Sequence, residues 1–381
     1  MGLLITAAVL LFGFGTAYVA SEEVRYLSRA GIEETRILVS RVPIIKLAKD
    51  PQVPDSLREM AGLVIEVRNY ARALGLDAKE TYTTYADVGR DTLLLVLTAS
   101  PKDCLCPVTW RYPVAGRVPY KGFFDFAAAR KAAKGFADQG HDVYLRPSAA
   151  FSTLGWFNDP LLSTALSRDS VELASLVFHE IAHNSLWVKG NTAFNESFAQ
   201  WVGYAAAQRF FLSRADTLSA LRAADRWHDE KALGEYYTVL LAKLDSLYAK
   251  KLPREANDSG RTAVAQWARD TMAGPFGSSF RTFAVDRLAE RPINNAALLG
   301  TRLYRSDLHL FDDWLESQGG DLTRAVLGLE RLLEDSEGDQ AFQRLKRLIQ
   351  AQRGARAPLP PLVPDSTASQ PPPSAPSAPS R

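Results

Sequence analysis

The segment His179-Glu180-Ile181-Ala182-His183 constrains the fold and chemistry of this chain more than any other. In a helix, side chains four positions apart lie on one face, so two imidazoles separated by one turn can reach the same metal ion. The glutamate beside the first histidine can then act on water held by that metal. The segment predicts a helix that carries two zinc ligands, His179 and His183, and a general base, Glu180.

The residues around this segment support a helix. Asp169 followed by Glu172 fits a capping box and predicts a helix start near Ser170. Apolar residues then recur at helical spacing, at Leu173, Leu176, Val177 and Ile181. The alternative is a core helix with two hydrogen-bonded histidines, but the chain has only 5 histidines among 381 residues. We therefore favour a metal-binding helix.

A catalytic zinc also needs a third protein ligand and an open position for water. Leu186 and Lys189 stand where the metzincin pattern places a glycine and a third histidine, which excludes that class. Thr192 can cap a second helix, and a short turn at residues 189–191 would fold it back on the first. Glu196 would then face the histidine pair as the third ligand. Its alternative role is a solvated residue favoured by the helix dipole.

The other histidines are weaker candidates. His228 could be a third ligand, but its polar neighbours predict an exposed helix face. His141 begins a predicted strand and His309 lies in a late helix. We interpret all three as structural or solvated, although His309 could approach the site from the C-terminal half.

Composition and charge bound the class of protein. The chain is 46% hydrophobic and 23% charged, with a formal net charge of +2, which is typical of a globular protein. No block of basic residues alternates with aromatics, so nucleic acid is not an expected partner. The length allows one large domain or two small ones.

The two ends of the chain differ from this body. Residues 3–20 are uncharged and predict a signal peptide or a membrane anchor, and so export to the periplasm or cell envelope. Residues 354–381 are dominated by Pro, Ser and Ala and predict a disordered tail. A single domain at 21–353 lies between them. Within it, Cys104 and Cys106 are too close to pair easily, and we interpret them as a loop or strand edge.

The predicted fold class is α+β, predominantly α. The spacing of apolar residues and the positions of turn-forming residues predict a small sheet before the metal-binding helix and a helical C-terminal half. The expected helices are 22–47, 56–75, 126–139 and almost everything after 170, including 215–251. The expected strands are 93–98 and 142–146, with mixed loop and strand at 112–124.

A substrate-binding strand is predicted just before the metal-binding helix. In many zinc peptidases an edge strand there pairs with the substrate backbone. Thr153 and Gly155 lie in such a segment, and the glycine would allow close approach. The equally weighted alternative is a strand that only braces the helix.

The chain resembles a bacterial family of predicted aminopeptidases, which are envelope proteins with an H-E-x-x-H motif. The resemblance rests on several stretches taken together, which span most of residues 22–335: Arg111–Phe124, Ser152–Pro160, His179–His183, Asn195–Ala199, and Pro292–Ala296 with Tyr304. Many family members look like lipoproteins, whereas this chain has no cysteine near its N-terminus to accept a lipid. The resemblance implies one zinc ion, a gluzincin-like peptidase and a peptide or protein substrate.

The mechanism expected from these residues needs further groups. Tyr304 is the first candidate to stabilise the tetrahedral intermediate, and His309 is the second. Asn294 and Asn295 could bind the substrate backbone or a free amine, or they could instead cap a helix. An endopeptidase acting on envelope proteins and a non-enzymatic zinc-fold scaffold are the alternatives to an aminopeptidase.

Overall fold

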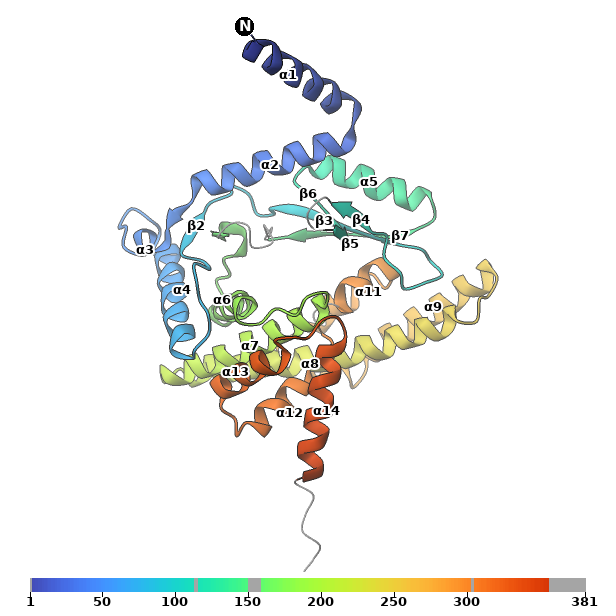
Figure 1. Ribbon diagram of the computed structural model, residues 1–381. Helices are drawn as coiled ribbons and strands as arrows, with labels where there is room; N and C mark the ends of the chain where they lie inside the picture. Colours follow the sequence, from blue (N-terminus) through green and yellow to red (C-terminus); the bar gives the residue numbers. More distant parts are fainter. Residues whose placement is uncertain (1, 113–115, 150–158, 303–304, 356–381) are drawn as a thin grey trace, which may run out of the picture.

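The computed structural model describes residues 2–112, 116–149, 159–302 and 305–355. The described chain is mainly helical, with three small sheets that lie before the helix of the histidine motif in sequence. In Figure 1 the sheets lie above a body of helices. The predicted class, α+β and predominantly α, is confirmed at this level.

Two consecutive helices form the N-terminal segment. α1 (Gly2–Ala20) projects away from the body, and α2 (Glu22–Ser40) runs along its top (Figure 1). Ser21 caps α2 by accepting a hydrogen bond from the backbone N–H of Val24. Across the described residues, no helix combines the length and the apolar character needed to span a membrane. The roles predicted for residues 3–20, as a signal peptide or an anchor, remain predictions.

The central sheet is antiparallel, in the order β6-β3-β7. β3 (Leu94–Ser100) pairs with both β6 (Lys121–Phe123) and β7 (Asp142–Ser148). α5 (Phe126–Asp138) covers the sheet and packs Ala129 and Ala133 against Leu97. Because other elements cover β3 as well, almost every residue of this apolar strand is buried.

Two further sheets are smaller. β1 (Val42–Pro43), β2 (Thr84–Ala86) and β8 (Leu161–Leu162) form one, in which β2 and β8 are parallel. β4 (Trp110–Tyr112) and β5 (Gly116–Val118) form an antiparallel pair. β8 leads through a short 3₁₀ turn to the helix that carries the histidine motif, so this edge of the fold sets where that helix begins.

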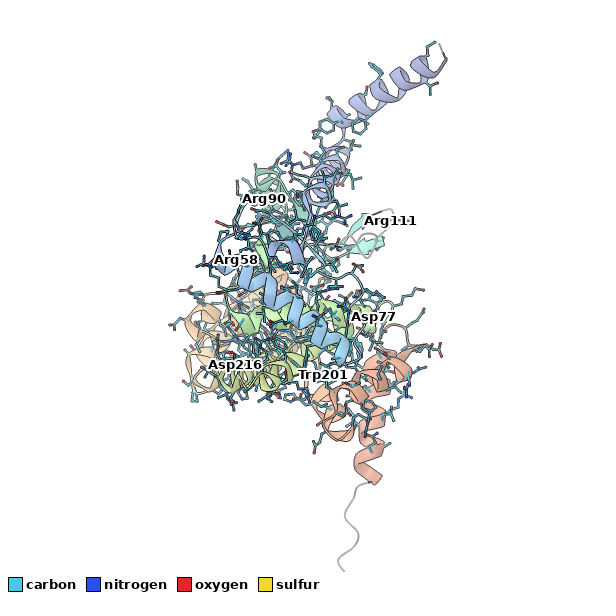
Figure 2. The ribbon with its side chains drawn as sticks, turned by 90° about the vertical axis from the view of Figure 1, so that its left-hand side faces the viewer. Arg58, Asp77, Arg90, Arg111, Trp201 and Asp216 are labelled. Atoms are coloured by element: carbon cyan, nitrogen blue, oxygen red, sulfur yellow. A yellow bond between two sulfur atoms is a disulfide. The ribbon has the colours of Figure 1, made fainter. Side chains whose placement is uncertain are left out.

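Helices build the rest of the body. The core lies where α4 (Asp55–Ala73), α6 (Ser170–Ser185) and α7 (Thr192–Ser213) meet, and Phe178, Phe198 and Trp201 are fully buried there. Trp201 lies inside this body in Figure 2. The remaining helices are α3 (Ile44–Leu47), α8 (Thr217–Tyr248), α9 (Arg254–Ala273), α10 (Val285–Ala289), α11 (Asn295–Arg302), α12 (His309–Ser317), α13 (Leu322–Leu333) and α14 (Gln340–Ala355).

Most expected elements are present with shifted ends. The expected helix 22–47 is the main error, since it breaks at Ser40 and resumes only at Ile44. Pro43 explains the break, because a proline disfavours helical geometry in the residue before it and has no N–H to donate. α14 also continues through Ala355, two residues into the predicted tail, whose remaining residues lie outside the described chain.

The two cysteines are joined in a disulfide in the loop after β3, contrary to the expectation that neighbours so close would stay unpaired. The carbonyls of Cys104 and Cys106 both accept hydrogen bonds from the Ser100 hydroxyl. The loop position itself was predicted, and these bonds fold it back onto the end of β3.

Candidate metal centre

α6 begins as its sequence predicts. The Asp169 carboxylate accepts hydrogen bonds from the backbone N–H groups of Val171 and Glu172, at 3.0 and 3.3 Å. The second half of the predicted capping box is wrong, because the Glu172 carboxylate bonds to Ser167 and Arg226 instead. The helix runs from this cap through the histidine motif to Ser185, so both histidines lie well inside it.

The turn between α6 and α7 orients the third candidate ligand. Gly190 has a φ of +76°, a left-handed conformation that glycine adopts without strain. Asn191 then caps α7 by accepting a hydrogen bond from the Phe194 N–H at 2.9 Å, so the prediction that Thr192 is the cap is wrong by one residue. The buried Asn195 amide accepts from the N–H of Val188 at 2.8 Å and donates to its carbonyl at 2.9 Å. These bonds fix the start of α7 against the turn.

Gly203 sets the distance between α6 and α7. A Cβ atom added there would lie 2.8 Å from the carbonyl oxygen of Ser175 and 3.5 Å from the Cβ of His179. Only a residue without a side chain lets the two backbones approach this closely. Gly203 lies two helical turns after Glu196, so the same packing brings Glu196 toward the histidines.

Glu196 faces the histidine pair, as the sequence predicts. The Nε2 atoms of His179 and His183 are 3.2 Å apart. Carboxylate oxygens of Glu196 lie 3.4 Å from Nε2 of His179 and 3.8 Å from Nε2 of His183. Within the described chain, this trio is the one group of three or more histidine, cysteine or acidic residues placed to hold a metal ion.

These separations fit a tetrahedral zinc site. Ligand atoms about 2.0–2.1 Å from a zinc ion at tetrahedral angles lie about 3.3–3.4 Å from one another. Two imidazoles and one carboxylate are also the donor set of a common class of catalytic zinc sites. The three side chains are 13–17% exposed, so the cluster is sheltered and still reachable from solvent. The residues therefore fit a zinc ion with one open position.

Burial and charge shape the protonation of the cluster. Burial, together with the charge of His179, lowers the pKa of His183 to about 4, which favours the neutral imidazole. Burial would also lower the pKa of His179, but a hydrogen bond with Glu196 and the charges of Glu180 and Glu196 outweigh it and raise that pKa. Burial would raise the pKa of Glu196, but its contacts with both histidines keep it low.

Glu180 occupies a different environment from Glu196. Burial raises the pKa of its carboxyl, the charge of His179 opposes that shift, and the charges of Glu196 and Asp159 add to it. The buried Tyr82 feels the charge of Glu180, since burial and that charge together raise the pKa of its hydroxyl. Glu180 thus lies beside the cluster without being part of it.

Two exposed aromatic residues near the cluster were missed from the sequence. The ring of Trp187, which is 59% exposed, lies 5.5 Å from the ring of His183. Tyr120 is 42% exposed, and partial burial and the charge of Glu196 raise the pKa of its hydroxyl. Trp187 lies four residues after His183, a spacing that could have indicated it. Nothing local to Tyr120 could have done so.

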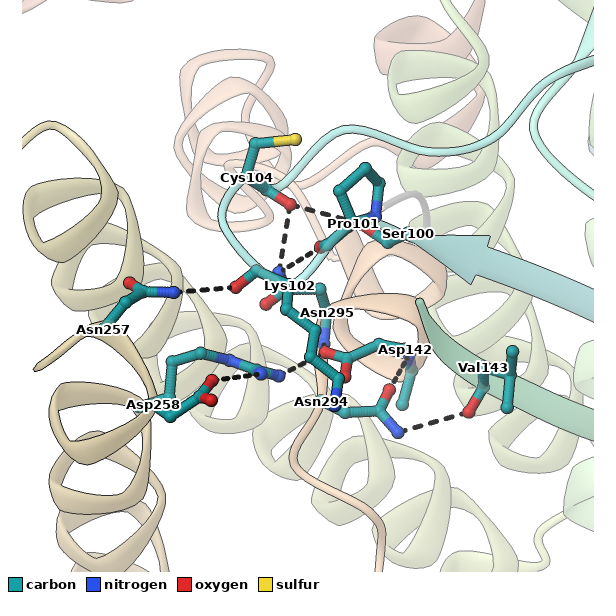
Figure 3. A network of polar contacts seen from close by, with 12 residues as sticks. Ser100, Pro101, Lys102, Cys104, Asp142, Val143, Asn257, Asp258, Asn294 and Asn295 are labelled. Carbon is teal, nitrogen blue, oxygen red and sulfur yellow. Dashed lines mark hydrogen bonds and ion pairs between the residues drawn. The ribbon is translucent and has the colours of Figure 1, made fainter. Parts of the chain in front are cut away.

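Asn294 and Asn295 hold a structural junction (Figure 3). Asn294 caps α11 by accepting a hydrogen bond from the Ala297 N–H at 2.9 Å. This is the helix-cap role that the sequence offered as the alternative to substrate binding. Asn295 is 1% exposed, and its amide donates to the carbonyls of Pro101 and Cys104 at 2.9 and 3.0 Å. Their side chains thus join α11 to the loop after β3, and the substrate-binding role remains a prediction.

The other predicted residues lie apart from the cluster or outside the described chain. His309 forms an ion pair with Glu235, with 2.6 Å between Nε2 and Oε1, and both side chains are more than half exposed. His228 contacts Asp229 on α8. Tyr304, Thr153 and Gly155 lie outside the described residues, so their predicted roles stay predictions.

The chain matches the family model described as "Putative aminopeptidase" over residues 25–345. The match covers most of the chain, so the protein belongs to this family, and membership implies a peptidase. No match was found among the curated proteins or among the solved structures.

Proposed function

We propose that this protein is a zinc-dependent peptidase, and specifically an aminopeptidase of the cell envelope. The observation that carries the proposal is the convergence of two imidazole nitrogens and one carboxylate oxygen at the spacing of zinc ligands, with Glu180 beside them. A purely structural zinc site has no need of that glutamate. The family match supports the peptidase class.

His179, His183 and Glu196 would hold the zinc ion. When bound, zinc lowers the pKa of a coordinated water to about 7 and polarises the scissile carbonyl. Glu180 accepts the proton of the attacking water and delivers it to the leaving amine. Tyr304 remains the candidate that stabilises the oxyanion. Trp187 offers exposed aromatic surface beside the cluster for a substrate side chain.

The general base is tested by Glu180→Gln. This variant should bind zinc as the parent does and lose peptide hydrolysis by about 10²- to 10⁴-fold, the usual contribution of acid–base catalysis. Glu172→Gln, on the exposed start of the same helix, is the matched control and should keep activity. Full activity in Glu180→Gln would refute the assignment.

The third ligand is tested by Glu196→Ala, which should lower the zinc content of the purified protein. Equal zinc content in this variant and the parent would remove Glu196 from the ligand set.

The mode of cleavage is tested with a mixed peptide library with free or blocked N-termini. An aminopeptidase cleaves only the free set, and an endopeptidase cleaves both. Cleavage of neither set favours the scaffold alternative.

The proposed location rests on the uncharged segment of residues 3–20. Export predicts that the protein fractionates with the periplasm or envelope of the producing bacterium. N-terminal sequencing of the mature protein tests whether the segment is removed, and recovery with the cytosolic fraction would contradict export.

A further inference from the structure

A cavity of about 260 Å³ opens between β7, α8, α9 and the segment that leads into α11. Four arginines line it, and none of its lining residues is acidic. The arginines come from distant parts of the sequence: Arg146, Arg269, Arg291 and Arg305. Apolar side chains such as Leu240, Met272 and Leu298 complete the wall. The cavity therefore combines apolar surface with an excess of positive charge.

Most of this charge is not neutralised locally. Arg305 is paired with Glu230, with 2.6 Å between Nε and Oε2, and both side chains are largely buried. No ion pair or side-chain hydrogen bond joins Arg146, Arg269 or Arg291 to another residue of the described chain. Guanidinium groups stay charged at every physiological pH. Several of them in one concave site attract an anion, and a carboxylate can bind bidentately.

The cavity lies beside the metal centre. Ser306, next to the lining residue Arg305, donates its backbone N–H to the hydroxyl of Ser197 at 3.1 Å. Ser197 directly follows Glu196 on α7. Burial and the charge of Glu196 raise the pKa of the Tyr120 hydroxyl, and the charge of the lining residue Arg146 opposes that shift, so Tyr120 senses a charge from the cavity and one from the cluster. The contact between Ser306 and Ser197 thus joins the segment that lines the cavity to the helix that carries Glu196.

We propose that this cavity binds a carboxylate of the peptide substrate, carried either by an acidic side chain or by the C-terminus. The inference rests on the proposed peptidase function and adds the substrate class. Carboxylates are the anions that an unmodified peptide offers. The apolar part of the wall suits the methylene groups next to a glutamate carboxylate.

The test compares Arg146→Gln and Arg291→Gln with Arg287→Gln. Arg287 is an exposed residue of α10, close in sequence to Arg291 and not part of the lining. Arg305 is left unchanged, because its loss would leave Glu230 buried without a partner. Arg291 is itself exposed, so its replacement tests binding even if Arg146→Gln fails to fold.

The substrates are four matched peptides in which one glutamate is kept or changed to glutamine and the C-terminus is free or amidated. The parent should favour peptides with a carboxylate by about tenfold to a hundredfold in kcat/KM, as expected for charge-assisted hydrogen bonds. The two cavity variants should lose this preference, with kcat/KM for the carboxylate peptides falling toward that for the neutral amide. Arg287→Gln should keep it. If kcat/KM of the parent falls when the glutamate is changed to glutamine, the bound carboxylate belongs to the side chain. If kcat/KM falls when the C-terminus is amidated, the bound carboxylate is that of the C-terminus.

Binding to the Glu180→Gln variant, measured by titration calorimetry with the same peptides, separates the two proposals. Carboxylate-dependent binding that Arg291→Gln abolishes supports the cavity even if no peptide is hydrolysed. Hydrolysis without any carboxylate preference, and equal binding of acidic and neutral peptides, would overturn the cavity and leave the peptidase intact.

Discussion

Gly203 offers a quantitative test of how α6 and α7 assemble the candidate metal centre. In Gly203→Ala the new Cβ would lie 2.8 Å from the carbonyl oxygen of Ser175. A comfortable carbon–oxygen contact is about 3.3 Å, so the helices must separate by roughly half an ångström. The atom that blocks the methyl group is backbone in the middle of a helix and cannot move by itself.

Two opposing effects set the magnitude. Overpacking of this kind costs about 1–3 kcal/mol, while replacing glycine by alanine inside a helix gains about 1 kcal/mol. The net loss of unfolding free energy should therefore be about 1 kcal/mol and can reach about 2 kcal/mol. Gly62→Ala in α4 is the matched control, since no atom lies within 4 Å of its added Cβ. That control should gain up to about 1 kcal/mol.

Urea denaturation of the metal-free proteins measures both free energies, and competition with a chromophoric chelator measures zinc affinity. Gly203→Ala should be less stable than Gly62→Ala. It should also bind zinc more weakly than the parent, because His179 lies on one of the two helices that the contact would push apart and Glu196 lies on the other. A Gly203→Ala protein as stable as Gly62→Ala, with parental zinc affinity, would refute this account of the packing.

Three further outcomes follow from the same structure. Asn195→Ala leaves the buried N–H and C=O of Val188 without partners, so urea denaturation should show a loss of about 1–3 kcal/mol; an unchanged midpoint would contradict the role given to this amide. Asp229 is fully buried, and burial alone would raise the pKa of its carboxyl. Hydrogen bonds from Thr282 and from the backbone N–H groups of residues 281–283 outweigh burial, so the net shift lowers that pKa. The ionised Asp229 therefore contributes its full stabilisation above the unfolded pKa of about 4, and this stabilisation is lost as the pH falls through the lower pKa of the folded state. The urea midpoint should accordingly fall more steeply with decreasing pH in the parent than in Asp229→Asn. Removal of metal by a chelator should abolish peptide hydrolysis, and zinc but not magnesium should restore it; activity that survives full metal removal would exclude the zinc mechanism.

The candidate site was predicted where the interactions are local. The helix periodicity that puts His179 and His183 on one face acts over four residues, and the Asp169 cap acts over three. The turn that brings Glu196 back also lies within a short segment, with a glycine at the position that needs a left-handed conformation. At the start of α7 the sequence missed which residue is the cap, since Asn191 and Thr192 are both good caps and neighbouring contacts decide between them.

The fold was predicted as a class and only roughly in its boundaries. The break of the first long helix depends on Pro43, whose effect on the preceding residue overrides the apolar spacing that favours one continuous helix. The hydrogen bonds of Asn295 show a different limit, because its partners at Pro101 and Cys104 are almost 200 positions away. No spacing within the motif around residues 292–296 indicates that contact.

The sequence by itself determined the helix that carries the histidine motif and the candidates for the metal ligands and the general base, because helical periodicity and capping depend on residues a few positions apart. Tertiary structure decided how close α6 and α7 lie, which aromatic residues surround the cluster, and which arginines share one cavity. Arg146 and Arg291 line one cavity only because α11 and the segment before it pack against β7. Such contacts arise from the packing of whole elements, and no local pattern records them.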